Sequence, residues 1–115
     1  MPIPSEITAL VDRLNQELNQ IEQEATGGVN LVRSLLFRFP DNAILTQYFA
    51  YFNSALFFIE TSRRQIQTSM EAISISPTDV PNEVIQEVGE DLAALLGLLL
   101  EVKLKVEQLM ARLLE

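Results

Sequence analysis

Four carboxylates in the last third of the chain form the densest group of side chains that could do chemistry. Glu83, Glu87, Glu90 and Asp91 recur at three- and four-residue spacings, which places most of them on one face of a helix. Carboxylates in such an arrangement could bind Mg²⁺ or Ca²⁺. They also fall near a predicted helix N-terminus, where the helix dipole favours negative charge. We therefore interpret them as a solvated acidic face.

Known helical metal sites require residues that this chain lacks. An all-helical nucleotide pyrophosphatase pairs Glu-x-x-Glu with a later Glu-x-x-Asp, and Glu87 and Glu90 supply only the first half of that pattern. Di-iron bundles use Glu-x-x-His pairs, and this chain has no histidine. We predict no metal site, no cofactor and no catalytic residue. A carboxylate–metal hydrolase is the weakest functional alternative.

Two other polar groups stand out in the middle of the chain. Arg63 and Arg64 are adjacent, so they point in different directions on a helix and do not form one anion site; one of them can pair with Glu60. Ser62 and Ser69 have no base to activate them. We expect their hydroxyls to bond to the preceding helical turn and to allow close packing.

The composition excludes several classes of function. The 115-residue chain has 16 acidic and 8 basic side chains, giving a net charge of −8, which disfavours binding to nucleic acid. It has no cysteine and no histidine, which removes thiol chemistry, disulfides and the usual zinc ligands. The first residues lack the charged and apolar regions of a signal peptide, which predicts a cytoplasmic protein. The longest apolar run, residues 92–100, is too short for a membrane span.

Prolines divide the chain into three segments of similar length. Pro40 separates the first from the second, and Pro77 and Pro81 separate the second from the third. Ser5, Asp41 and either Thr78 or Asp79 are candidate N-caps. The sequence predicts a single domain, residues 1–115, with helices at about 6–39, 42–74 and 81–114.

Each segment carries apolar or small residues at alternating three- and four-residue spacings, which is the heptad pattern of packed helices. The three predicted seams are Ile7, Val11, Leu14, Leu18, Ile21, Ala25, Gly28, Val32, Leu35 and Phe39; Leu45, Tyr48, Phe52, Ala55, Ile59, Ser62, Ile66, Ser69 and Ile73; and Ile85, Val88, Leu92, Leu95, Leu99, Val102, Val106, Leu109 and Leu113. Equal helix lengths predict an all-α, elongated up-down-up bundle of three antiparallel helices. Because the first seam continues through Gly27 and Gly28 without a phase change, we expect a helix that is unbroken or only kinked there, with Gly28 in the core.

Charge and apolar surface are separated along this predicted rod. Residues 1–26 and 60–91, here called the acidic end, carry a net charge of −9, and residues 27–59 and 92–115, the apolar end, carry +1. The helical segments at the apolar end are hydrophobic over a broad face. A three-helix core cannot cover all of that face.

The third helix carries a second apolar stripe opposite its seam, and outward-facing aromatics lie at the same end. Since soluble proteins rarely expose such a patch, we expect a second copy of the chain to cover it. The predicted oligomer interface comprises Ala93, Gly97, Leu100, Leu104, Ala111, Leu114, Phe57 and Phe37.

These observations favour a binding function over catalysis. We predict a non-enzymatic helical interaction or scaffolding protein that forms a homo-oligomer, a dimer or larger, through its apolar end. The alternative is a small acidic chaperone or adaptor that binds an amphipathic helix of a client protein on the same surface. An apolar ligand between the helices is a third possibility, but the sequence offers no polar anchor for a head group.

Overall fold

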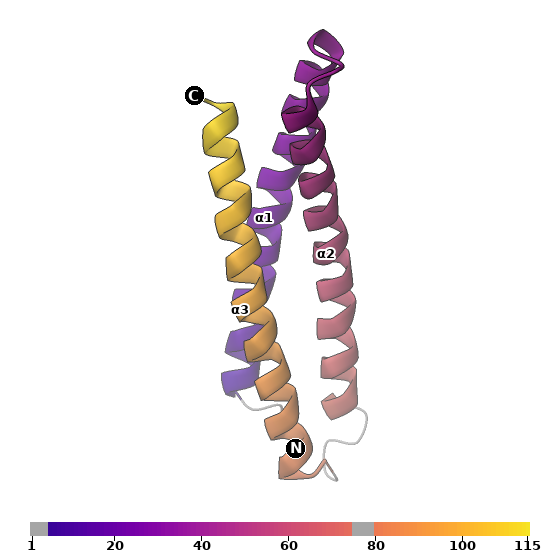
Figure 1. Ribbon diagram of the computed structural model, residues 1–115. Coiled ribbons are helices and arrows are strands. Elements are labelled where there is room, and N and C mark those ends of the chain that lie inside the picture. Colours follow the sequence, from indigo (N-terminus) through magenta and orange to yellow (C-terminus); the bar gives the residue numbers. More distant parts are fainter. Residues whose placement is uncertain (1–4, 75–79) are drawn as a thin grey trace.

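The computed structural model describes residues 5–74 and 80–115, and these residues form three long helices (Figure 1). They are α1 (Ser5–Arg38), α2 (Ala43–Ser74) and α3 (Asn82–Leu113). The helices run up, down and up within an elongated body of 59 × 20 × 17 Å. The predicted all-α, elongated three-helix architecture is therefore confirmed. The helix ends lie within one residue of the expected positions.

The first interhelical turn is stabilised by a residue other than the predicted cap. The backbone N–H of Leu45 donates to Oδ1 of Asn42 at 3.0 Å, so Asn42, and not Asp41, caps α2. The prediction of Asp41 is wrong because the turn after Pro40 is one residue longer than we expected. The hydroxyl of Thr46 also donates to the carbonyl oxygen of Asn42 at 3.1 Å.

Among the described residues, no side chain forms a cap hydrogen bond at the start of α3. Pro81 occupies the N-cap position with φ −63° and ψ 148°, whereas we expected it inside the first turn. Its carbonyl oxygen accepts hydrogen bonds from the backbone N–H groups of Val84 and Ile85. The other cap candidates, Thr78 and Asp79, lie outside the described residues.

The core follows the predicted seams closely. Leu14, Leu18, Ile21, Phe52 and Leu99 are fully buried, and Val29 is a buried apolar residue that the seam did not include. Phe39 is the clearest departure, because it is 52% exposed. Since α1 ends at Arg38, Phe39 leaves the helix before its side chain can turn inward. The guanidinium of Arg38 lies 5.7 Å from its ring centre.

Gly28 lies inside the bundle, and α1 is continuous through it. An added Cβ at this position would lie 2.7 Å from the ring of Phe52 on α2, whereas an added Cβ on exposed Gly27 would meet nothing within 4 Å. Neither glycine has a positive φ. The glycine at position 28 is therefore required for the close approach of α1 and α2 and not for a turn.

Candidate functional site

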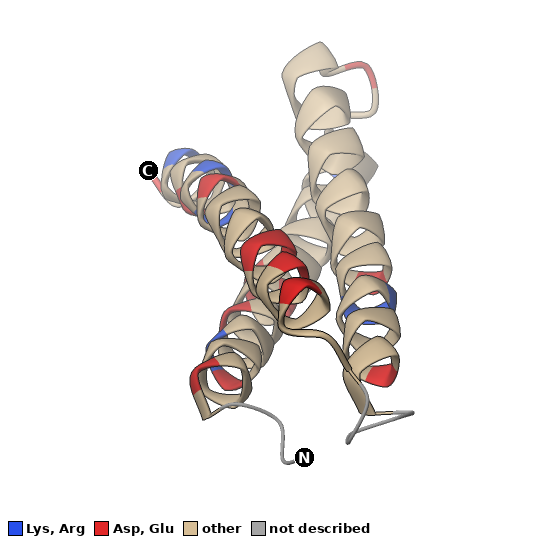
Figure 2. Ribbon diagram, turned by 90° about the horizontal axis from the view of Figure 1, so that it is seen from below, with Lys and Arg blue, Asp and Glu red and all other residues tan. Residues whose placement is uncertain are grey.

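The four acidic residues of the N-terminal part of α3 do not form a metal centre in the described structure. Glu83, Glu87, Glu90 and Asp91 are all exposed, and the described residues contain no group of three or more potential ligand side chains close enough to share an ion. Oε1 of Glu90 accepts a hydrogen bond from Nε2 of Gln86 at 3.1 Å. In Figure 2 several ribbon segments near the start of α3 are coloured red for Asp and Glu.

The two serines differ in burial. Ser62 is 1% exposed, and its Oγ has no hydrogen-bond partner among the described residues, so the expected bond to the preceding turn is wrong. Ser69 is half-buried. A buried, unsatisfied hydroxyl lowers the stability of the fold, and no base lies nearby to make Ser62 a nucleophile.

Arg63 joins α2 to α1 instead of pairing along its own helix. Its guanidinium donates two hydrogen bonds to the carboxylate of Glu22, at 2.7 and 3.2 Å, and one to Oδ1 of Asn19 at 2.8 Å. The hydrogen bond from Arg63 holds the pKa of Glu22 below its usual value. Arg64 is exposed. Sequence spacing could not find the Glu22 pair, because its two members lie 41 residues apart.

A second polar group lies between α1 and α3. Nζ of Lys103 donates to Oε2 of Glu17 at 2.9 Å, and both side chains are less than a quarter exposed. Glu24 has a buried Oε2 without a hydrogen-bond partner in the described structure. Burial and the nearby carboxylates of Glu107 and Glu17 raise the pKa of Glu24, while Lys103 lowers it. This group links α1 to α3.

Exposed apolar side chains are concentrated at the apolar end. Among the described residues, seven large apolar side chains are between 51% and 91% exposed: Phe37, Phe39, Ile44, Phe57, Leu98, Leu104 and Leu114. All seven fall within residues 27–59 or 92–115. In Figure 1 the turn that joins α1 to α2 extends beyond the last turn of α3, and Phe37, Phe39 and Ile44 lie at or beside this turn in the sequence.

The structure also places the eight predicted interface residues. Phe37, Phe57, Leu104 and Leu114 are 91%, 68%, 60% and 72% exposed, respectively. Ala93, Gly97 and Ala111 are exposed, and Leu100 is half-buried.

These eight residues do not lie on one side of the rod. Phe57 lines a shallow hollow with Glu22 and Thr26 of α1, on the seam where Glu22 binds Arg63 of α2. Ala93 lies on the other seam of α1, where α1 meets α3. Phe57 of α2 and Ala93 of α3 therefore lie beside different seams of α1.

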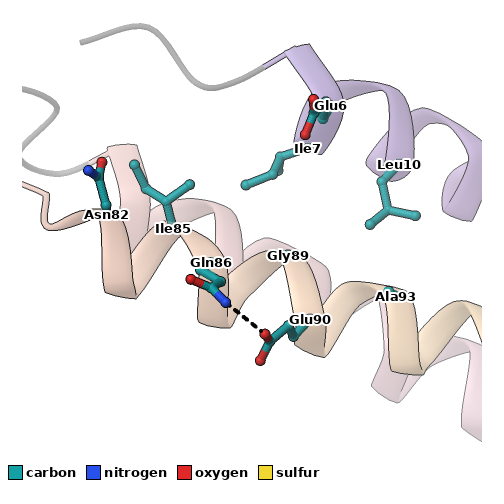
Figure 3. A pocket seen from close by; sticks show the side chains of 9 residues that line it. All are labelled: Glu6, Ile7, Leu10, Asn82, Ile85, Gln86, Gly89, Glu90 and Ala93. Carbon is teal, nitrogen blue, oxygen red and sulfur yellow. Dashed lines mark hydrogen bonds between the residues drawn. The ribbon is translucent and has the colours of Figure 1, made fainter.

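A groove with a volume of about 580 Å³ lies between the first turns of α1 and α3. Its lining residues are Glu6, Ile7, Leu10, Asn82, Ile85, Gln86, Gly89, Glu90 and Ala93. Figure 3 shows Ile7 and Leu10 pointing from α1 toward α3. On the facing side of α3, Gly89 has no side chain and Ala93 has only a methyl group. Of these lining residues, the sequence predicts only Ala93 on an interaction surface, since a groove depends on which helices become neighbours.

Comparisons add no relative whose function could be considered. No family model, curated protein or solved structure shows significant similarity to this chain. None of the three helices, over the described residues, is both long and apolar enough to cross a membrane.

Proposed function

We propose that this chain is a non-enzymatic, cytoplasmic helical interaction protein that self-associates through the outward face of α3 at its apolar end. The observation that carries the proposal is the exposure of Leu104 and Leu114, 60% and 72%, on a helix whose seam already fills the core. Exposed Ala93 and Gly97 continue this face toward the acidic end, and their small side chains permit a second helix to approach closely.

Charge favours one arrangement of the two copies. If two α3 helices pack antiparallel about a twofold axis near Leu104, the apolar stripes overlap and the acidic ends project in opposite directions. The apolar ends, with a net charge of +1 each, then meet without strong repulsion. A parallel arrangement would place two acidic ends, each with a net charge of −9, side by side.

Sedimentation analysis at micromolar concentration tests the proposal. Wild-type protein is expected to sediment as a dimer or larger species, and the double variant Leu104→Glu with Leu114→Glu is expected to sediment as a monomer with unchanged helical content. Phe57→Glu is the matched control, because it introduces the same charge at a 68% exposed residue on a different side of the rod. A wild-type monomer, or an oligomer that the double variant does not weaken, would contradict self-association through α3.

If the wild-type protein is a monomer, the alternative function, binding of a client protein, is favoured. That function requires capture of an amphipathic helix on the same face of α3, and capture must be lost in the Leu104→Glu, Leu114→Glu variant.

A further inference from the structure

We infer that the groove between α1 and α3 at the acidic end binds a basic amphipathic helix of another protein. This groove lies at the acidic end and shares only Ala93 with the surface proposed for self-association, and its lining combines an apolar floor with carboxylates on both walls. Each of these properties restricts the class of partner.

The floor of the groove is apolar and exists because two residues of α3 are small. Ile7 is buried, Leu10 and Ile85 are half-buried, and no heavy atom lies within 4 Å of a Cβ added to Gly89. Gly89 and Ala93 therefore leave open a space that larger side chains would fill (Figure 3). An apolar side chain from a partner gains free energy by entering it, because the space removes that side chain from water.

The dimensions of the groove suit a helix. Its lining on α3 extends from Asn82 to Ala93, which is about 16 Å of helix at about 1.5 Å per residue. Apolar residues at positions i, i+4 and i+7 of a partner helix span roughly 10 Å, so two or three of them fit along the floor. Both walls of the groove are helices, so the groove has no free strand edge for an extended peptide.

Charge determines the type of helix. Glu6 stands on the α1 wall and Glu90 on the α3 wall, and residues 5–13 and 82–93 together carry a net charge of −5. The two helix N-termini at this end offset only about one unit of that charge, at about half a unit each. In Figure 2 the ribbon of α1 and of α3 carries acidic positions, coloured red, at the end where both helices begin. A partner with lysine or arginine on either side of its apolar stripe complements these walls.

The same charge disfavours a second copy of this chain as the occupant. The net charge of the chain is −8, and its acidic end carries −9. Docking the acidic end of another copy into this groove would bring like charges together, and the apolar end, with a net charge of +1, offers little complementary charge. A small polar ligand is also disfavoured, because the polar lining side chains Glu6, Asn82, Gln86 and Glu90 are all exposed and provide no buried anchor.

Fluorescence anisotropy with a labelled synthetic peptide tests the inference on the full chain. The probe is a helix of about 18 residues with a leucine stripe flanked by lysines, and the comparison peptide has glutamate at each lysine position. The lysine peptide is expected to bind with a Kd of about 1–100 µM, and the glutamate peptide is expected to show no saturation at about 1 mM. Raising the salt from about 0.05 M to about 0.5 M is expected to weaken binding, because salt screens exposed charges.

Two sets of variants locate the binding site. Gly89→Leu is expected to weaken binding at least about tenfold by filling the floor, whereas Gly27→Leu is expected to leave it unchanged. Both glycines are helical, and a Cβ added to either meets nothing within 4 Å, so neither substitution strains the bundle at that atom. Glu6→Gln with Glu90→Gln is expected to weaken binding about three- to tenfold without obstructing the floor.

The outcomes separate this inference from the proposed self-association. The Leu104→Glu, Leu114→Glu variant is expected to bind the lysine peptide as well as the wild type does. Equal binding of both peptides, no saturable binding of the lysine peptide, or full binding by Gly89→Leu would overturn the inference. A change of oligomeric state in Gly89→Leu would also overturn it, because the groove would then be occupied by a second copy.

Discussion

The ring of Phe52 on α2 lies 2.7 Å from the position that a Cβ atom on residue 28 of α1 would occupy. Phe52 is fully buried, so its ring has no free space into which it can move. This pair sets the distance between α1 and α2 at the centre of the rod. It also explains why the heptad seam contains a glycine at that point.

Substituting the two adjacent glycines is therefore expected to have opposite effects. Gly28→Ala is expected to lower the free energy of unfolding by about 1–3 kcal/mol through overpacking against Phe52. Gly27→Ala is expected to raise it by about 0.5–1 kcal/mol, because alanine favours the helix and meets no neighbour. Urea denaturation at a fixed protein concentration measures both changes. If Gly28→Ala were as stable as Gly27→Ala, Phe52 would not limit the approach of α1 and α2.

The cap of α2 gives a second pair of adjacent positions. Asn42→Ala is expected to destabilise the protein by about 1 kcal/mol, because the N–H of Leu45 loses its acceptor. Asp41→Ala is expected to change stability by less than about 0.5 kcal/mol, since Asp41 is exposed and lies outside the helix. Thermal unfolding followed by circular dichroism compares the two variants. A larger loss of stability in Asp41→Ala than in Asn42→Ala would show that Asp41 caps α2.

Two glutamates of α1 are expected to give opposite dependences of stability on pH. The pKa of Glu24 is raised, chiefly by burial, so the folded state binds a proton there more readily than the unfolded state does. The stability that Glu24 contributes is complete below its unfolded pKa and is lost as the pH rises through the folded pKa. Glu24→Gln is therefore expected to raise the melting temperature at pH 7, by an amount that shrinks on acidification.

Glu22 is the matched control, because its pKa is shifted in the opposite direction from that of Glu24. Its pKa is lowered, chiefly by the hydrogen bond from Arg63, so its contribution is present above its unfolded pKa and is lost as the pH falls through the folded pKa. Because 45% of the Glu22 side chain is exposed, Glu22→Gln is expected to cost only about 0.2–1 kcal/mol at pH 7. Melting curves from pH 3 to pH 8 compare the variants. Destabilisation of Glu24→Gln at pH 7 would show that its carboxylate is ion-paired in solution.

The unsatisfied hydroxyl of Ser62 makes an alanine at that position favourable. Ser62→Ala is expected to raise the free energy of unfolding by about 1 kcal/mol, because it removes a buried polar group without a partner. Ser54→Ala, an exposed serine of the same helix, is expected to add only a few tenths of a kcal/mol from helix propensity. Urea denaturation measures the free energy of unfolding of both variants and of the wild type. A loss of stability in Ser62→Ala would mean that the hydroxyl donates to the preceding turn after all.

The architecture was predictable because its signals are local. Leu14, Leu18 and Ile21 are buried where the heptad pattern places them, and Pro40 separates the first two helices as expected. The site was much less predictable. Leu104 and Leu114 could be assigned to an outward face from their spacing, but the groove lined by Gly89 and Ala93 could not, because its other wall belongs to α1.

The sequence alone determined the three helices, their seams and the separation of charge from apolar surface, since the helical period and the order of charges are properties of the chain itself. The tertiary structure decided which groups meet: Arg63 with Glu22, Lys103 with Glu17, Gly28 with Phe52, and Gly89 with an open groove. These pairings depend on how far each helix is rotated and shifted along its neighbour. That rotation and shift follow from the shapes of side chains many residues apart, and no local spacing encodes them.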